Sequence, residues 1–207
     1  MSRNDTGAAA WASQDAAASG VVAYSFRPSL MSPPREFIVE ADALAWSIGR
    51  HSGRVPYRAI RRIRLSYRPV TLQMHRFQIE IWSDAAPKFV IASSSWRSMV
   101  EQNRQDPDYR SFVLALHRRL VAAGANPALH AGAPGFAYWP GLVVFFAMVV
   151  VLPLMLVRTA HGDAFWGTAL IALVIGAFLW QIGGFFWRNR PATYAAGSIP
   201  TVVLPRG

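Results

Sequence analysis

The chain of 207 residues contains no cysteine and a single lysine. Without cysteine it has no disulfides, no thiolate metal ligands and no cysteine nucleophile. Arginine supplies 20 of the 21 basic residues, and only 11 residues are acidic. The resulting net charge of +10 and pI near 11.1 favour contact with phosphate, either of lipid or of nucleic acid.

The motifs of common enzyme classes are also missing from the sequence. The five histidines include no pair at helical spacing and no HExxH motif. Ser93, Ser94 and Ser95 lie outside a GxSxG pattern, and the glycines form neither a P-loop nor a dinucleotide fingerprint. We therefore predict that the protein is not an enzyme and binds no metal or cofactor. Each histidine is expected on the surface or in a loop.

Charge is absent from two long runs near the C-terminus, Tyr138 to Val157 and Ala164 to Trp187. Each run is long enough to cross about 30 Å of hydrocarbon as a helix. The short connection predicts a hairpin of transmembrane helices at 138–158 and 164–187. The connection carries Arg158 alone, whereas more arginines flank the hairpin, so the positive-inside rule predicts that both termini are cytosolic.

Two small residues on the second of these helices are candidates for helix packing. Ala172 and Gly176 are four residues apart and would lie on one helix face. Small residues at this spacing let helices approach closely. Packing within the hairpin and contact with a second copy both remain open, and a homo-oligomer is neither required nor excluded.

The residues before the hairpin indicate a folded domain. Residues 1–22 are rich in alanine, serine and glycine, lack the pattern of a signal peptide, and are predicted to be disordered. Residues 36–93 alternate as short strands, with Gly49 to Gly53 as a hairpin loop. The apolar positions predicted to face inward include Phe37, Val39, Leu44, Val55, Tyr57, Ile63, Leu65, Tyr67, Phe77, Ile79, Ile81, Phe89 and Ile91.

A helix closes this domain. Asp106 is predicted to be the N-cap of this helix, with Pro107 in its first turn. An apolar stripe follows at Tyr109, Phe112, Val113, Leu116 and Leu120. We therefore predict an α+β membrane protein. Its domain at 23–128 would be a small β-barrel or bent antiparallel sheet capped by one helix, and a linker at 129–137 would lead to the transmembrane hairpin.

Two phrases of the sequence carry a resemblance to a known family. "GRHSGRVPYRAIRRIRL" and the helix "YRSFVLALHRRLVAAG" resemble bacterial PH-like domains of small membrane proteins, and Val55, Pro56, Tyr57, Ile60 and Ile63 match that family's strand motif. The tail "NRPATYAAGSIPTVVLP" is similar to the ending of a group of proteobacterial inner-membrane proteins. The resemblance implies a PH-like fold and an inner-membrane location, but no activity. The chain departs from many relatives because its apolar helices follow the domain.

The stretch between residues 50 and 76 contains no acidic residue but many arginines. A strand through Ile63 and Leu65 would turn the arginines outward, away from a core. The candidate contact residues are Arg50, Arg54, Arg61, Arg62, Arg64 and Arg68. A solvated face, anionic lipid headgroups and an acidic protein partner remain as explanations. Nucleic acid is disfavoured because the sequence shows no known binding motif and the domain is tethered beside a membrane.

The leading hypothesis is a non-enzymatic, membrane-anchored adaptor or assembly module with an unidentified membrane protein partner. The first alternative is a subunit of a transport or envelope-biogenesis complex, in which the hairpin is the working part. The second is a membrane enzyme with an unrecognised site. The tail, residues 188–207, is predicted to be extended and to dock either on the domain or on a partner, with a sheet edge as a candidate position. Its apolar anchors would be Tyr194, Ile199, Val202, Val203 and Leu204.

Overall fold

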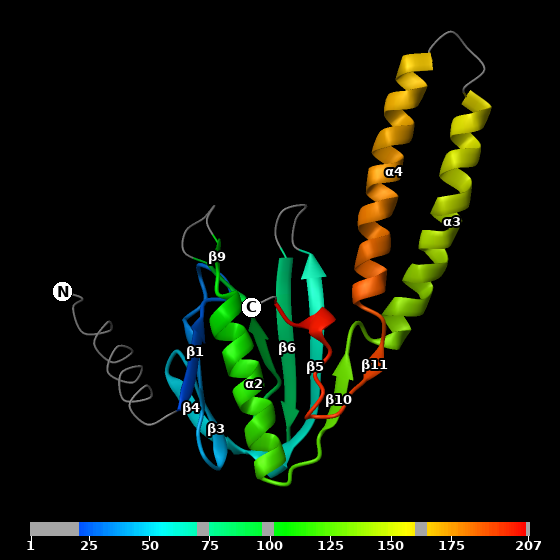
Figure 1. Cartoon of the computed structure of the whole chain (residues 1–207). Coiled ribbons are helices and arrows are strands. Elements are labelled where there is room, and N and C mark those ends of the chain that lie inside the picture. The colour runs from blue at the N-terminus through cyan, green and yellow to red at the C-terminus, as the bar shows by residue number, and fades with distance from the viewer. Residues whose placement is uncertain (1–20, 70–74, 97–101, 160–164, 206–207) are drawn as a thin grey trace, which may run out of the picture.

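The computed structural model of the chain describes residues 21–69, 75–96, 102–159 and 165–205 (Figure 1). Most of the segment predicted to be disordered, 1–22, therefore lies outside the described residues. The fold is α+β, and it begins with a strand that the sequence analysis did not identify. The first sheet, sheet A, has the antiparallel order β1-β2-β3-β4, comprising β1 (Val22–Phe26), β2 (Arg35–Val39), β3 (Ala43–Ile48) and β4 (His51–Pro56).

A second sheet, sheet B, follows a short 3-10 turn at Tyr57–Ala59. Its strand order is β11-β10-β5-β6-β7, and all neighbours are antiparallel except β10, which runs parallel to β5. Its strands are β5 (Ile60–Pro69), β6 (His75–Ser83), β7 (Phe89–Ala92), β10 (Ala128–Ala131) and β11 (Ala192–Thr193). A separate short pair contains β8 (Ser94–Trp96) and β9 (Gln102–Arg104).

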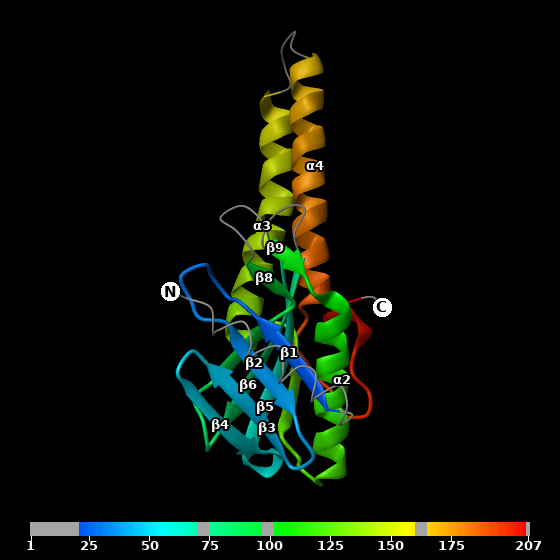
Figure 2. The same cartoon turned by 90° about the vertical axis from the view of Figure 1, so that its left-hand side faces the viewer.

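Helix α2 (Asp106–Ala122) packs against both sheets through the predicted stripe (Figures 1 and 2). All five stripe residues are buried, and Phe112 is in contact with the rings of Tyr24 and Phe37 from sheet A. The helix cap is Gln105, one residue earlier than predicted, so Asp106 is the first helical residue. At the other end Gly124 has φ +61°, a conformation that glycine adopts without strain.

The predicted barrel is not closed within the described residues. Sheets A and B share a core but exchange no strand pairing there, and α2 covers the side between them. A side-chain bond joins the sheets instead, because the Tyr24 hydroxyl donates to the carbonyl of Ala92 over 2.6 Å. The predicted loop at 49–53 is also shorter than expected, since Ile48 pairs with His51 and leaves a two-residue turn whose Gly49 has φ +61°.

The positions of sheet B predicted to face the core are confirmed. On its outward face, however, several side chains are buried that the alternating pattern predicts to be exposed. Ile63, Leu65 and Tyr67 are buried in the core. On the opposite face Ser66, Gln78 and Glu80 are also buried, although the pattern placed them in water. These polar side chains lie on β5 and β6, in the middle of the five-stranded sheet.

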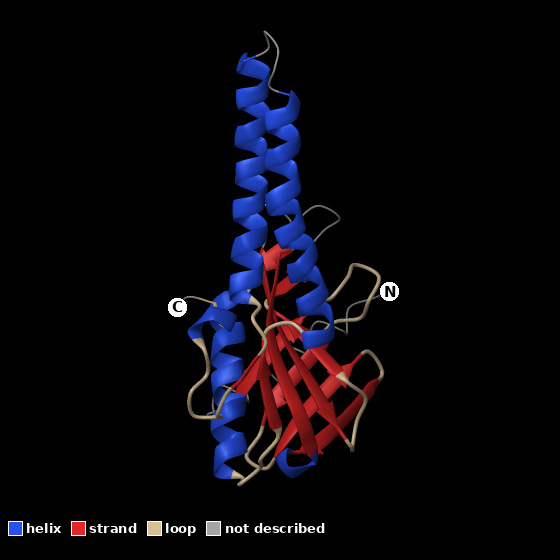
Figure 3. Ribbon diagram, turned by 90° about the vertical axis from the view of Figure 1, so that its right-hand side faces the viewer, coloured by secondary structure: helices blue, strands red, loops and turns tan. Residues whose placement is uncertain are grey.

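Two helices rise from one end of the domain, α3 (Gly135–Thr159) and α4 (Phe165–Arg188), as Figures 1 and 3 show. Both are long and apolar enough to cross a membrane, and most of their large apolar side chains are exposed. They pack through aromatic rings against glycines. An added Cβ at Gly141 would lie 3.2 Å from the Phe186 ring, and one at Gly183 would lie 3.4 Å from the Phe145 ring.

The small residues predicted for helix packing lie elsewhere on α4. Ala172 and Gly176 are exposed, and an added Cβ at Gly176 would meet no atom within 4 Å. The glycines at the contact surface, Gly141 and Gly183, lie toward the domain end of the hairpin, where aromatic rings fill the space between the helices.

The segments on either side of the hairpin are part of sheet B. Ala128, at the predicted end of the domain, and residues 129–131 of the predicted linker together form β10 beside β5. After α4 the chain returns as β11, which pairs antiparallel with β10 through His130 with Thr193 and Ala131 with Ala192. The predicted docking of the tail on a sheet edge is therefore confirmed for residues 192–193.

The rest of the tail crosses to α2. Val203 and Leu204 are buried in the core, whereas Val202 is exposed, and Arg110 donates to the carbonyl of Pro205 over 2.8 Å. Near the middle of the helix, Tyr194 covers His117. The expectation that every histidine is superficial is thus wrong for His117, which is 1% exposed. The contact with Tyr194 comes from the returning tail, 77 residues further along the chain, and is not apparent from local sequence.

The His117 ring is held between a backbone and a side-chain partner. Nδ1 donates to the carbonyl of Val113 at 2.8 Å, which leaves Nε2 to accept the Tyr194 hydroxyl at 2.9 Å. Burial lowers the pKa of His117 below its ordinary value of 6.5, although the bond to Val113 partly opposes the shift. The unfolded chain therefore binds a proton at a higher pH than the folded chain does.

We predict that stability falls as the pH drops from 7.5 through 6.5 toward 5, because protonation then favours the unfolded chain. One such group contributes at most about 1.4 kcal/mol per pH unit. Denaturant unfolding at pH 7.5 and at pH 5 measures the change in the free energy of unfolding. His117→Gln, which keeps a polar side chain but does not titrate, should flatten the profile. A profile that is unchanged in His117→Gln would assign the pH dependence to other groups.

Candidate functional site: the hairpin junction and the outer face of sheet B

Asn189 fixes the junction between the apolar helices and sheet B. This residue follows α4 directly and is 1% exposed. Its Oδ1 accepts the backbone N–H of Tyr67 at 3.1 Å, and its Nδ2 donates to the carbonyl of Phe185 at 3.3 Å. Its own carbonyl accepts the N–H of Ala133 at 2.9 Å. One side chain and its backbone therefore link the end of α4, the end of β5 and the approach to α3.

Two further contacts support this junction. Gly132 donates to the carbonyl of Leu65 at 2.8 Å and continues the pairing of β10 with β5 up to the base of α3. The Arg188 guanidinium lies 5.0 Å from the centre of the Tyr67 ring, within the range of a cation–π contact. The hairpin is therefore attached to the sheet through short polar and aromatic contacts at both of its ends.

Three cations surround one aromatic ring on the outer face of sheet B. The charged groups of Arg62, Arg64 and Lys88 lie 5.8, 5.5 and 4.5 Å from the Trp82 ring. Arg62 lies directly opposite Trp82 on the neighbouring strand, and Lys88 immediately precedes β7. The ring face carries partial negative charge and attracts these cations. We refer to these four residues as the cationic patch.

A buried carboxylate forms ion pairs with two of the cations in the cationic patch. Glu80 is 7% exposed, and its Oε1 lies 2.9 Å from the Lys88 ammonium. The Arg64 guanidinium is 3.9 Å from Oε2, and Gln78 donates to Oε1 at 3.2 Å. Glu80 also lies directly opposite Arg64 on the neighbouring strand. Three cations against one carboxylate leave two positive charges on this surface.

His130 extends the outer face toward the hairpin. It lies on β10 directly opposite Arg64 and lines a hollow of about 510 Å³ with Arg64, Pro134, Pro191 and Thr193. Burial, together with the positive charges of Arg62 and Arg64, lowers the pKa of His130. The ring is therefore neutral at pH 7, and its nitrogens can hydrogen-bond without adding charge.

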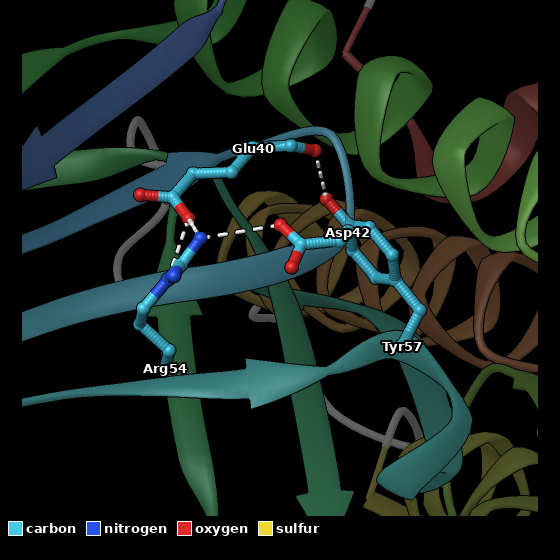
Figure 4. A network of polar contacts seen from close by, with 4 residues as sticks. All are labelled: Glu40, Asp42, Arg54 and Tyr57. Atoms are coloured by element: carbon cyan, nitrogen blue, oxygen red, sulfur yellow. Dashed lines mark hydrogen bonds and ion pairs between the residues drawn. The ribbon is translucent and has the colours of Figure 1, made fainter.

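Arg54 lies on sheet A, away from the cationic patch, and is held by acidic residues (Figure 4). Its Nε donates to Glu40 at 2.8 Å, and its terminal nitrogen contacts both Glu40 and Asp42. The Tyr57 hydroxyl donates to the Glu40 carbonyl at 2.7 Å, and burial raises the Tyr57 pKa to about 12, so this donor stays protonated. The stretch between residues 50 and 76 has no acidic residue of its own. The carboxylates that pair with Arg54 come from outside it, from Glu40 and Asp42.

The other predicted arginines separate as well. Arg61 is the extra residue of a bulge in β5, where Ile60 pairs with Ser83 and Arg62 with Trp82, and it forms an ion pair with Asp84. Arg50 is exposed in the turn of sheet A, and Arg68 is exposed near the end of β5. Of the six candidates, the structure brings only Arg62 and Arg64 together around one ring.

Sequence reasoning missed the partners that organise this site. Trp82 continues the outward alternation of β6, so its orientation was available from the pattern. Lys88 follows Trp82 by six residues, at the turn between β6 and β7, but no motif marks it. His130 and Asn189 lie far along the chain from β5, and only the tertiary structure brings them to it.

The chain matches no protein-family model, no curated protein and no solved structure. The resemblance to bacterial PH-like membrane proteins therefore stays a prediction.

The junction depends on the absence of a side chain at Gly132. This residue has φ +82°, and an added Cβ would lie 2.2 Å from the carbonyl oxygen of Arg190. We predict that Gly132→Ala destabilises the protein by at least about 2 kcal/mol, since left-handed geometry alone costs about 1–2 kcal/mol. Denaturant unfolding of the full chain in detergent measures it. Gly197→Ala is the matched control, because its Cβ meets nothing within 4 Å. Equal effects of the two substitutions would contradict this role.

Proposed function

We propose that the protein is a non-enzymatic, membrane-anchored adaptor that presents the cationic patch to an acidic segment of a partner protein. The observation that carries the proposal is the attachment of the hairpin to the same sheet that bears the patch. Asn189 and Gly132 join the helices to β5, and β5 carries Arg62 and Arg64. Such an attachment would hold the patch at a set height and orientation beside the bilayer.

In this proposal α3 and α4 cross the inner membrane of a bacterium, and both termini are cytosolic. Their exposed apolar surface supports the crossing, because water does not favour such a surface on two successive helices. Charge supports the orientation. Arg158, in the last turn of α3, is the single lysine or arginine at the end of the hairpin away from the domain. Of the other 20, Arg188 ends α4 beside the domain, and the rest lie in the N-terminal segment, the domain or the tail.

In this proposal the arginines of β5 lie at different distances from the bilayer, and this distance decides which of them suit lipid and which suit a protein. Tyr67 is level with the base of α4, where it contacts Asn189 and Arg188, so Arg68 is the nearest of the predicted β5 arginines to the bilayer. Arg62 is six residues further from that end, about 20 Å along an extended strand. Headgroups therefore suit Arg68, whereas the cationic patch around Trp82 suits a protein partner.

The chemistry of the patch supports an acidic ligand. Glu80 and Trp82 hold the cations in place before binding, which reduces the side-chain entropy lost on association. Arginine also presents donors in a planar arrangement that matches carboxylates. An aromatic ring flanked by arginines is a composition typical of the centres of protein interfaces.

We predict that Arg62→Gln/Arg64→Gln/Lys88→Gln weakens binding of a fluorescent decaglutamate peptide by about tenfold, a loss of about 1.4 kcal/mol. Anisotropy titration of the full chain in nanodiscs of neutral lipid, at low salt, measures the affinity. Arg50→Gln/Arg58→Gln/Arg118→Gln removes the same charge from exposed positions elsewhere and should have a much smaller effect. Equal losses in the two triple variants would show that only net charge matters, and would contradict the proposal.

We also predict that a reporter which fluoresces only in the cytosol gives signal when fused after Gly207. The positive-inside argument requires this result, because the tail pairs with the arginine-rich domain through β11. The same reporter placed between Arg158 and Asp163 should stay dark. Signal from the inter-helix position, with none from the C-terminus, would reverse the orientation.

A further inference from the structure

The loop between β1 and β2 displays its two most apolar side chains to solvent. The segment reads RPSLMSPPR from Arg27 to Arg35. Met31 is 100% exposed and Leu30 is 37% exposed, whereas most apolar residues of sheet A are buried or packed against the core. The two arginines are its only charged residues.

The loop is constrained by several contacts. Ser32 N donates to the Ser29 carbonyl at 3.2 Å, and the two serine hydroxyls lie 2.8 Å apart, so a tight turn presents Leu30 and Met31. Pro33 packs against Gly49, where an added Cβ would come within 3.2 Å of the proline ring.

The base of the loop is tied to β8. Arg27 N donates to the Ser95 hydroxyl at 2.9 Å, and its carbonyl accepts the N–H of Trp96 at 3.0 Å. Exposure of the tip is therefore a feature of the folded loop rather than of an untethered segment.

The loop lies at the end of the domain from which α3 and α4 rise. Figures 2 and 3 show the β1–β2 connection at the end of these two strands that is nearer the long helices. A bilayer that contains the hairpin would meet the domain at this end. The interfacial region of a bilayer accepts apolar side chains at a depth of about 5–10 Å, with basic side chains reaching headgroup phosphates.

We propose that Leu30 and Met31 insert into the membrane interface, with Arg27 beside headgroup phosphates, as a second attachment of the domain to the bilayer. This rests on the proposed function, because it requires the hairpin to enter the same bilayer. A lipid surface is the occupant that fits best. The helices place it at this end of the domain, and the segment from Arg27 to Arg35 combines apolar and basic side chains without an acidic residue. A second attachment would restrict rotation of the domain about the hairpin.

The absence of native cysteine allows a single label to test this depth. An environment-sensitive fluorophore on Met31→Cys, in the full chain in nanodiscs that hold one copy, should be quenched by bromine on the lipid acyl chains. Ala85→Cys is the control. Ala85 is exposed in the turn that follows β6, at the end of that strand away from the apolar helices. Quenching at position 31 should exceed that at position 85 by at least about fivefold if the tip reaches the interface.

A label on Val150→Cys separates failure of this inference from failure of the proposed anchor. Val150 is 65% exposed in the middle of α3, so it should be quenched whenever the hairpin lies in the bilayer. Quenching at 150 without quenching at 31 overturns the loop insertion alone. Quenching at neither position overturns both the insertion and the anchor.

The contribution of Arg27 has its own test. In nanodiscs with acidic lipid, Arg27→Gln should lower the inserted population about fivefold, from about 1 kcal/mol per basic residue near an anionic surface. Arg118→Gln, an exposed arginine in the second half of α2, should leave position 31 quenched as before. Equal quenching in Arg27→Gln and Arg118→Gln would remove Arg27 from the insertion.

Discussion

The hydrogen bonds of Asn189 determine how the two apolar helices relate to the rest of the molecule. A long apolar hairpin interrupts sheet B between β10 and β11, and the polar backbone where the chain leaves and re-enters the sheet needs partners. Asn189 provides them by accepting from Tyr67 and Ala133 and donating to Phe185. Gly132 has no side chain, and the backbone at Arg190 can therefore pass close to it. As a result β11 pairs with β10 on the far side of the hairpin, and the tail that follows packs against the core.

This attachment means that one end of sheet B lies close to the apolar helices and the other end lies far from them. The base of α4 meets the end of β5 that carries Tyr67, so positions along β5 differ in their height above the helices. The cationic patch lies toward the far end, whereas the loop with Leu30 and Met31 lies at the near end. Two chemically different surfaces are thus separated by the length of a strand, which supports separate partners for them.

Electrostatic pairing explains why a strongly basic chain does not present a uniformly basic surface. Glu40, Asp42, Asp84 and Glu80 each reach an arginine that is distant in sequence. Exposed pairs of this kind contribute little to stability, about 0–1 kcal/mol each. Their main consequence is positional, because they hold guanidinium groups in defined places. Trp82 and Glu80 do this most fully, since they arrange three cations on one side of the sheet.

The sequence by itself determined the features that depend on local periodicity. The alternation around Ile63 and Leu65 identified core strands, the stripe through Phe112 identified the covering helix, and the two uncharged runs identified the long helices. These signals succeed because side chains repeat every two residues in a strand and about every 3.6 residues in a helix.

Only the tertiary structure decided which distant residues meet. The tail buries His117, β10 brings His130 beside Arg64, and Asn189 contacts Tyr67, although each pair is separated by more than 60 residues in the sequence. Such contacts follow from strand order and from the hydrogen bonds that buried backbone must make, and a local pattern records neither. The periodicity therefore located the arginines on β5, but the pairing of strands selected the two that share Trp82.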